Sequence, residues 1–204
     1  MKWGKNKTKK QTDELNYRED TKAFLVYLRD LLLWVTGAML IFTFLFRIVI
    51  VSGSSMEQTL FDGDCLLLLS NTFYSEPQQG DIVVISKGSY DDGKSIIKRI
   101  IATEGQVVNI DFNAGVVYVD GVALDEPYVN TPTNLEEGTQ FPLTVDEGCV
   151  FVLGDNRNVS KDSRSTDIGQ IDQREIVGKA IFLVFPGNSG GNITRDFNRI
   201  GAVS

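Results

Sequence analysis

The chain has 204 residues, of which 42% are hydrophobic, and a formal net charge of −7 at pH 7. This length can bury one compact core but is too short for two full domains plus a membrane span, so one folded domain with an anchor is the simplest organisation. The sequence contains no histidine. Catalysis by Ser-His-Asp or Cys-His is therefore excluded, and the commonest ligand of catalytic zinc is missing. Any hydrolytic base must be a lysine, a carboxylate or a terminus.

Charge is distributed unevenly along the chain. Residues 1–30 contain eight basic and five acidic side chains, whereas residues 52–204 contain eleven basic and twenty-two acidic ones. Binding to nucleic-acid phosphates needs a basic surface. The acidic main segment therefore argues against nucleic acid as a partner.

The N-terminal segment, residues 1–30, is polar and lysine-rich without apolar periodicity, so we expect a mobile basic tail. Residues 31–46 follow without a formal charge, and Arg47 separates them from the apolar run 48–51. Helical residues 31–51, at about 1.5 Å each, reach roughly the thickness of the hydrocarbon layer if Arg47 snorkels toward the headgroups. The sequence thus predicts one transmembrane helix over 31–51.

Two alternatives for this apolar segment are less favoured. A cleaved signal peptide would have a shorter basic region and a small-x-small cleavage pattern, and a core helix would show a polar face, which residues 31–46 lack. Five of the first ten residues are lysines, so the positive-inside rule places residues 1–30 in the cytoplasm and residues 52–204 outside. We expect a single-pass protein of the cell membrane, with the lipid bilayer as a partner.

Beyond the apolar segment, short β-branched runs alternate with Gly, Pro, Asn and Asp. These runs are 65–69, 81–85, 96–102, 115–121, 149–154 and 179–185. They predict an all-β domain over 52–204, an antiparallel β-sheet or barrel. Residues 105–148 are expected to form a small β extension, with a hairpin turn at Asp120-Gly121. Cys65 and Cys149 are too few for a disulfide framework, which favours free buried thiols over a single bridge.

Because histidine is absent, lysine becomes the candidate base. A lysine amine has an unperturbed pKa of about 10.4, so it must be desolvated to be neutral near pH 7. Lys98 shares one face of a predicted strand with Ile96 and Ile100, where an apolar residue would be expected. The alternative is an edge-strand lysine that opposes aggregation.

Two polar segments could complete a site with Lys98. In VSGSSMEQTLFDGD, residues 51–64, a tight turn could expose Ser55 and aim backbone amides at an oxyanion, although such serines are often only a linker. GDNRNVSKDSR, residues 154–164, follows an apolar run and is either a solvated turn or a loop of charge-assisted hydrogen bonds.

These segments resemble, in the same order, four blocks of the bacterial type I signal peptidases. The blocks are GSSMEQTL (53–60), DGDCLLLL (62–69), IIKRIIATEGQ (96–106) and GDNRNVSKDSR (154–164), of which the last is the most specific. With the anchor, the resemblance covers about residues 30–185. It implies a membrane-bound serine endopeptidase that removes signal peptides from exported preproteins after small residues at −3 and −1, through an acyl-enzyme and with no metal or cofactor.

The resemblance also implies roles for individual residues. Ser55 is the nucleophile, Lys98 is the general base, and Ser160 is the hydroxyl that orients the lysine amine. Four further residues are implied to support the site: Arg99, Asp155, Asp162 and Arg164.

The chain departs from the family pattern at three places. Gln58 replaces the usual proline, and TEGQ at 103–106 replaces the usual LPGD. Neither change touches a predicted catalytic atom, so we expect altered loop stiffness or substrate preference rather than loss of activity. Gly53 stands where some relatives carry a serine of the oxyanion hole, which leaves more to the backbone amide of Ser55.

Other functions are weighed against this one. Ser95 and Lys98 match a Ser-x-x-Lys motif of penicillin-interacting enzymes, but two strand isoleucines lie between them and the companion motifs are missing. The self-cleaving repressors use a similar Ser-Lys pair, but they also need a DNA-binding domain, where this chain has the predicted membrane span and basic tail. A catalytically silent signal-peptidase-like factor in pilus or export-complex assembly remains the main alternative. The oligomeric state and the particular preproteins are left open by the sequence.

Overall fold

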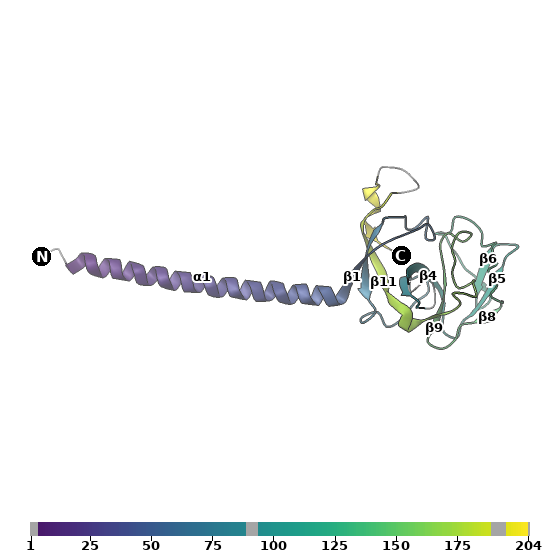
Figure 1. The fold of residues 1–204 in the computed structure, drawn as a ribbon, viewed down its shortest axis with the longest axis horizontal. Coiled ribbons are helices and arrows are strands. Elements are labelled where there is room, and N and C mark those ends of the chain that lie inside the picture. The colour runs from purple at the N-terminus through teal and green to yellow at the C-terminus, as the bar shows by residue number, and fades with distance from the viewer. Residues whose placement is uncertain (1–3, 89–93, 189–194, 204) are drawn as a thin grey trace. The chain divides into compact units, whose positions relative to one another are not determined.

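The computed structural model describes residues 4–88, 94–188 and 195–203, with side chains from residue 21 onward (Figure 1). Contacts divide the chain into an N-terminal helical unit, Met1–Phe44, and a β-domain, Leu45–Ser204.

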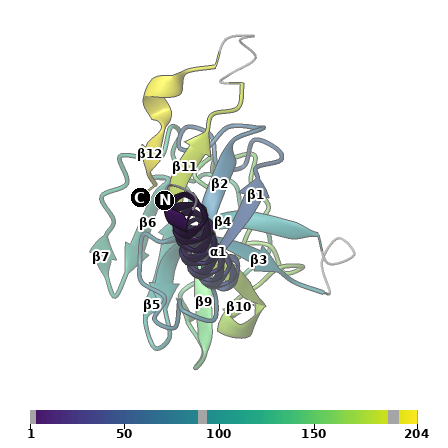
Figure 2. The same ribbon diagram turned by 90° about the vertical axis from the view of Figure 1, so that its left-hand side faces the viewer.

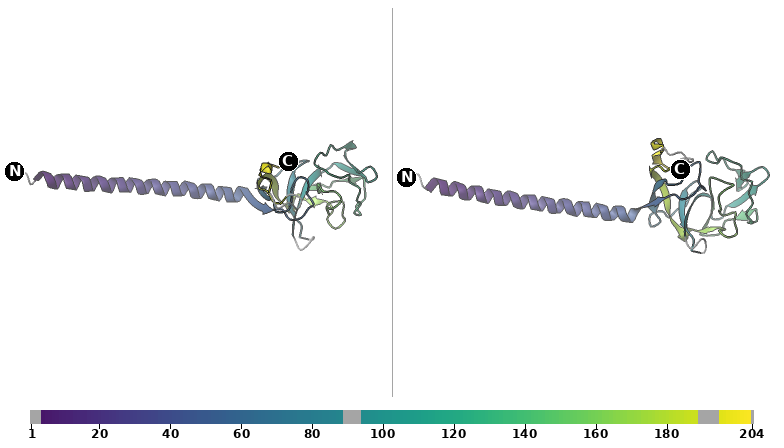
Figure 3. Two further views of the ribbon diagram at one scale, coloured as in Figure 1. Left: turned by 90° about the horizontal axis from the view of Figure 1, so that it is seen from above. Right: turned by 45° about the horizontal axis from the view of Figure 1, so that its top comes forward.

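Helix α1 runs from Gly4 to Leu45 as one continuous rod, seen from two further directions in Figure 3. The basic segment expected as a mobile tail is therefore helical from Gly4 onward, and its mobility stays a prediction. No proline occurs in the helix, and Lys, Glu, Gln and Arg favour helix in its polar part. Its stretch Thr21–Leu45 has a mean hydropathy of 1.7 and is long and apolar enough to cross a membrane.

The helix ends earlier than predicted. Residues Phe46–Ile50 are strand β1, which pairs antiparallel with β2 (Cys65–Ser70), so the predicted helix end at residue 51 is wrong. The run FRIVI is rich in aromatic and β-branched residues, which favour strand. Hydropathy alone does not separate such a strand from the end of an apolar helix.

Antiparallel pairing builds the main sheet, as the all-β prediction requires (Figure 2). In the described residues its strand order is β1-β2-β11-β3-β4-β9-β10, with β12 paired to β11. The remaining strands are β3 (Ile82–Ser86), β4 (Ser95–Thr103), β9 (Cys149–Leu153), β10 (Ile171–Asp172), β11 (Ile176–Phe185) and β12 (Gly201–Ala202). Short 3-10 helices occupy Gln173–Glu175 and Phe197–Arg199.

A second, four-stranded sheet lies within residues 105–148. Its order is β7-β6-β5-β8. The strands are β5 (Val107–Asp111), β6 (Val116–Val119), β7 (Val122–Ala123) and β8 (Leu143–Thr144). Asp120 (φ 51°) and Gly121 (φ 78°) turn β6 into β7, as two-residue hairpins require.

The two sheets share a core. Val108 and Val117 of the second sheet pack with Phe151 and Leu153 of β9 in one buried cluster. A segment that buries its apolar face against the main sheet is an extension of that domain rather than a separate one.

The cysteines of the β-domain are free. Cys65 and Cys149 are each half-buried rather than fully buried, and they are not joined by a disulfide.

Candidate active site

Ser55 lies in the turn that joins β1 to β2. Backbone hydrogen bonds between Val51 and Asp64 (2.8 Å) and between Gly63 and Val51 (2.9 Å) close the ends of this turn. Met56 and Leu60, each 1% exposed, bury themselves in the core below it. The buried side chains of Met56 and Leu60 and the hydrogen-bonded ends of the turn together hold Ser55 in one place.

Lys98 reaches this turn from the middle of β4. Its side chain is 3% exposed. The amine Nζ donates to Ser55 Oγ at 2.9 Å and to the backbone oxygen of Ile97 at 3.0 Å. The structure thus brings together the two residues that the sequence proposed as nucleophile and base; we call them the dyad.

Burial changes the acid–base behaviour of the lysine. Loss of solvent around the amine lowers the pKa of Lys98 from 10.5 to about 8, against the opposing effect of nearby carboxylates. Near neutral pH a useful fraction of the amine is then uncharged. An uncharged amine beside a hydroxyl can take its proton, which an ordinary lysine cannot do.

Arg99, the next residue of β4, anchors the site to Asp155. Its Nε and Nη2 donate to the two carboxylate oxygens at 2.9 and 2.8 Å, and both side chains are buried. Thr59 Oγ1 donates to the same carboxylate at 2.5 Å. One carboxylate therefore joins the base strand, the serine turn and the loop that follows β9.

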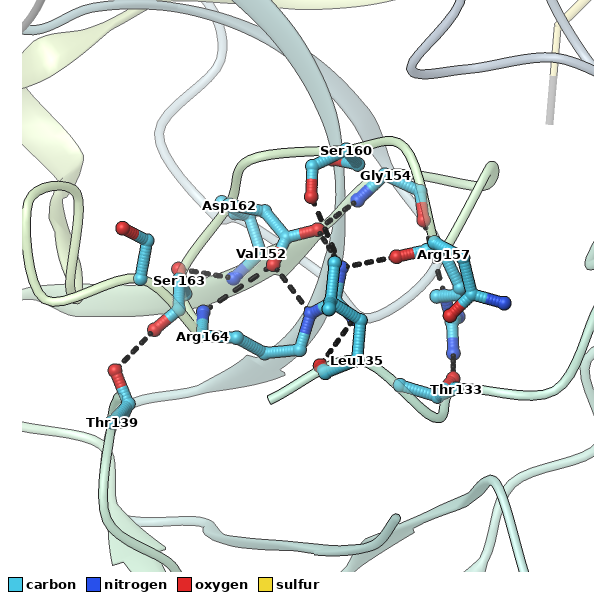
Figure 4. A network of polar contacts seen from close by, with 12 residues as sticks. Thr133, Leu135, Thr139, Val152, Gly154, Arg157, Ser160, Asp162, Ser163 and Arg164 are labelled. Atoms are coloured by element: carbon cyan, nitrogen blue, oxygen red, sulfur yellow. Dashed lines mark hydrogen bonds and ion pairs between the residues drawn. The ribbon is translucent and has the colours of Figure 1, made fainter. Parts of the chain in front are cut away.

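Asp162 and Arg164 form a second buried pair inside that loop (Figure 4). Arg164 Nε and Nη2 donate to the Asp162 carboxylate at 2.8 and 2.9 Å, and the backbone amide of Gly154 donates to it at 3.0 Å. Arg164 Nη2 also donates to the backbone oxygens of Arg157 and Ser160. The loop is thus folded around one guanidinium, which makes it rigid.

The same loop holds the backbone of the nucleophile. The Asn156 amide donates to the Ser55 carbonyl at 3.0 Å, and Asn156 Nδ2 donates to the Ser54 carbonyl at 3.0 Å. Gly154 leaves no room for a side chain, because a Cβ there would lie 2.5 Å from the Ser55 carbonyl oxygen. Sequence reasoning gave Asn156 no role, although it stands in the most specific motif.

Ser160 does not make its predicted contact. Its hydroxyl is buried and has no hydrogen-bond partner within the described part of the chain, so no hydrogen bond from it to the Lys98 amine is formed. It packs against Gly154, where a Cβ would lie 2.2 Å from Ser160 Oγ. An orienting role for Ser160 stays a prediction.

Two further ion pairs were not predicted from the sequence. Arg157, fully buried, binds Glu126 with both terminal nitrogens and so joins the loop to the β extension. Asp64, also fully buried, binds Arg199 from the far end of the chain at 3.0 and 2.6 Å. Both partners are distant in sequence, and no local motif marks either contact.

A pocket of about 190 Å³ opens beside the dyad. Its walls are polar and apolar in nearly equal measure. They include Val49 and Val51, together with Ile96 and Ile97 at the start of β4, and Ser55 lies among the lining residues. A small apolar side chain would fit such a space next to the serine hydroxyl.

Of the three departures from the family pattern, Gly53 and Gln58 lie in the turn that carries Ser55, and TEGQ lies at the end of β4. The Gln58 side chain is exposed. In the TEGQ turn, Gln106 accepts from the Thr103 amide at 3.0 Å and donates to Asp120 at 2.9 Å, so this side chain stiffens the turn. Neither glutamine hydrogen-bonds to the dyad in the described residues.

A serine hydroxyl against a buried lysine amine, on an antiparallel β-domain without histidine, is the arrangement of a hydrolase with a serine nucleophile and a lysine base.

The family model described as signal peptidase, peptidase S26, matches residues 25–185, and the chain belongs to this family. It is 34% identical over 172 residues to signal peptidase I of Bacillus licheniformis, covering 79% of this chain and 89% of the relative. Signal peptidase I T of Bacillus subtilis (strain 168) is 34% identical over 192 residues, covering 88% and 95%. The probable signal peptidase I-1 of a Synechocystis strain is 37% identical over 150 residues, covering 70% and 73%.

Proposed function

We propose that the protein is a membrane-anchored serine endopeptidase that removes signal peptides from exported preproteins, with Ser55 as nucleophile and Lys98 as general base. The observation that carries the proposal is the 2.9 Å contact between Lys98 Nζ and Ser55 Oγ, formed by a lysine that is 3% exposed. Membership of the signal peptidase family supports the substrate class.

The chemistry follows from the dyad. Neutral Lys98 takes the proton of the Ser55 hydroxyl as Oγ attacks the carbonyl carbon of the scissile peptide, while backbone amides of the turn stabilise the oxyanion. The protonated amine then gives its proton to the leaving nitrogen, and an acyl-enzyme remains on Ser55. In the second half of the reaction the amine deprotonates a water that hydrolyses this ester.

The pocket of about 190 Å³ beside Ser55 can receive a substrate side chain before the cut. The preference for small residues at −3 and −1 is what the family resemblance implies. Strand β1 ends the main sheet, so one of its edges is unpaired within the described residues. An extended preprotein segment can add to such an edge as a further strand.

The membrane anchor is part of the proposal. The stretch Thr21–Leu45 of α1 is long enough to span the hydrocarbon layer, and β1 follows it directly in the chain. The lysines of the first ten residues place the N-terminus in the cytoplasm by the positive-inside rule, and the β-domain on the opposite side.

One assay tests this function. The detergent-solubilised full chain is incubated with a precursor that carries alanine at −3 and −1, and the product is sequenced from its new N-terminus. We expect cleavage directly after −1. The variant Ser55→Ala should lose activity by about a thousandfold or more, because its nucleophile is gone. Ser75→Ala, which removes an exposed hydroxyl after β2, is the matched control and should keep it.

Two results would contradict the proposal. Cleavage by Ser55→Ala at the wild-type rate would remove the serine from the mechanism. An inert wild-type chain would favour the catalytically silent assembly factor instead.

A further inference from the structure

Three carboxylates act on the buried Lys98 amine, and they are not equivalent. Asp155 and Asp162 are each bound bidentately by a buried arginine. The third, Glu137, is half-buried, and its Oε2 is fully buried without a hydrogen-bond partner in the described residues. The family resemblance gave Asp155 and Asp162 supporting roles but assigned nothing to Glu137.

The segment that carries Glu137 is fastened on both sides to the loop that surrounds the site (Figure 4). Before it, the Leu135 carbonyl accepts from Arg164 Nη1 at 3.1 Å. After it, Gly138 forms a β-bridge with Ser165, and the Thr139 amide donates to the Arg164 carbonyl at 2.9 Å. Glu137 therefore stands between two fixed points, and its carboxylate is held against the loop rather than free in solvent.

We propose that Glu137 is a positioning residue of the dyad, whose carboxylate stabilises the protonated Lys98 amine and so raises the pH above which the enzyme becomes active. The inference rests on the proposed role of Lys98 as general base.

The charges around both groups fix the sign of the effect. Burial lowers the pKa of Lys98; Asp162, Asp155 and Glu137 raise it, and Arg164 lowers it. Burial and the Asp162 charge raise the pKa of the Glu137 carboxyl, whereas Arg164, a hydrogen bond from the Asp162 backbone and Lys161 lower it. A negative charge near an ammonium favours its protonated form. Removing the Glu137 charge must therefore lower the pKa of Lys98 and increase its neutral fraction near pH 7.

Glu137 also offers the cleanest substitution among the three carboxylates. Neutralising Asp155 or Asp162 leaves a buried arginine without its partner, which disturbs the fold itself. Glu137→Gln keeps the shape of the side chain and breaks no arginine pair of the described structure.

The test compares the pH profile of kcat/KM, from pH 6 to pH 10, between the full-length wild type and Glu137→Gln. We expect the acidic limb to move to lower pH, with kcat/KM at pH 7 about threefold higher, as for loss of one partly screened charge pair. The alkaline plateau should change less than twofold, because Lys98 is neutral there in both proteins. Glu136→Gln removes the same charge from the exposed neighbour and should keep the wild-type profile.

A direct titration separates this inference from the proposed function. The ¹³Cε resonance of Lys98, assigned by its loss in Lys98→Met, reports the protonation of the amine without any substrate. A titration midpoint that falls in Glu137→Gln but not in Glu136→Gln supports the inference even if no precursor is cleaved. An unmoved midpoint overturns it even if cleavage by the wild type is efficient.

A second neutral variant guards against misfolding. Glu137→Ala should move the acidic limb in the same direction, whereas Glu137→Asp keeps the charge and should retain a profile close to wild type. If the aspartate variant moves as far as the glutamine variant, shape rather than charge controls the site, and the inference is wrong.

Discussion

Replacing Lys98 by methionine is expected to abolish cleavage and to stabilise the β-domain at the same time. Methionine has a similar length, but it has no amine to take the Ser55 proton, so kcat should fall about a thousandfold or more. The stability gain arises because the native fold keeps an ammonium group away from water. Its pKa falls from 10.5 to about 8 on folding, which corresponds to roughly 3 kcal/mol of destabilisation near neutral pH.

The pH dependence of this gain has a definite sign. Below pH 8 the folded and unfolded chains both hold the proton, so the full cost of burying the charged amine is present. Between pH 8 and 10.5 the unfolded chain binds more protons, and the wild type gains stability as pH rises. The advantage of Lys98→Met should therefore be largest below pH 8 and fade toward pH 10.5.

Urea unfolding of the detergent-solubilised full chain measures this gain, and the precursor assay measures the loss. Lys98→Arg is the matched control, since its guanidinium stays charged: it should be equally inactive but should gain no stability. If Lys98→Met is less stable than the wild type at pH 7, burial of the charged Lys98 amine does not destabilise the fold, and this prediction is wrong.

Gly154→Ala is expected to lower kcat strongly because it moves the nucleophile, although it removes no catalytic group. A Cβ at this position would lie 2.2 Å from Ser160 Oγ and 2.5 Å from the Ser55 carbonyl oxygen, so the loop and the serine turn must separate. Overpacking of this kind costs about 1–3 kcal/mol of stability. A displacement of the dyad by about 1 Å lowers kcat on the order of a hundredfold.

The control for this variant is Gly201→Ala, because no atom lies within 4 Å of the Cβ it would add. Steady-state kinetics should show the loss in kcat for Gly154→Ala and wild-type behaviour for Gly201→Ala. Wild-type turnover by Gly154→Ala would mean that the close approach of the loop to Ser55 does not position the nucleophile.

Much of the fold and of the candidate site could be predicted from the sequence because both depend partly on local residue patterns. Short β-branched runs between turn residues predicted antiparallel sheets, and Asp120-Gly121 predicted a hairpin that the structure contains. The absence of histidine directed attention to Lys98, and an apolar strand around it predicted burial. The structure places that amine against Ser55.

The rest depends on contacts that no local pattern encodes. The strand Phe46–Ile50 is as apolar as the stretch Thr21–Leu45 before it, so its β-branched residues alone did not separate it from a helix end, whereas its pairing with β2 does. The pairs Asp64–Arg199 and Glu126–Arg157 join distant segments of the chain. Glu137 lies outside every motif, and contacts of Leu135 and Thr139 with Arg164 join its segment to the site loop. Tertiary packing decides such features, not residue spacing.

The pH dependence of kcat/KM, measured beside the ¹³Cε titration of Lys98 in the same full-length protein, tests the central claim most directly. If a buried, neutral Lys98 is the base, kcat/KM rises with pH and the ¹³Cε shift of Lys98 titrates over the same range. Both midpoints should lie near pH 8, the value to which burial lowers the pKa of Lys98. An amine that titrates near 10.5, as an exposed lysine does, or a cleavage rate that stays constant from pH 6 to pH 10, would contradict it.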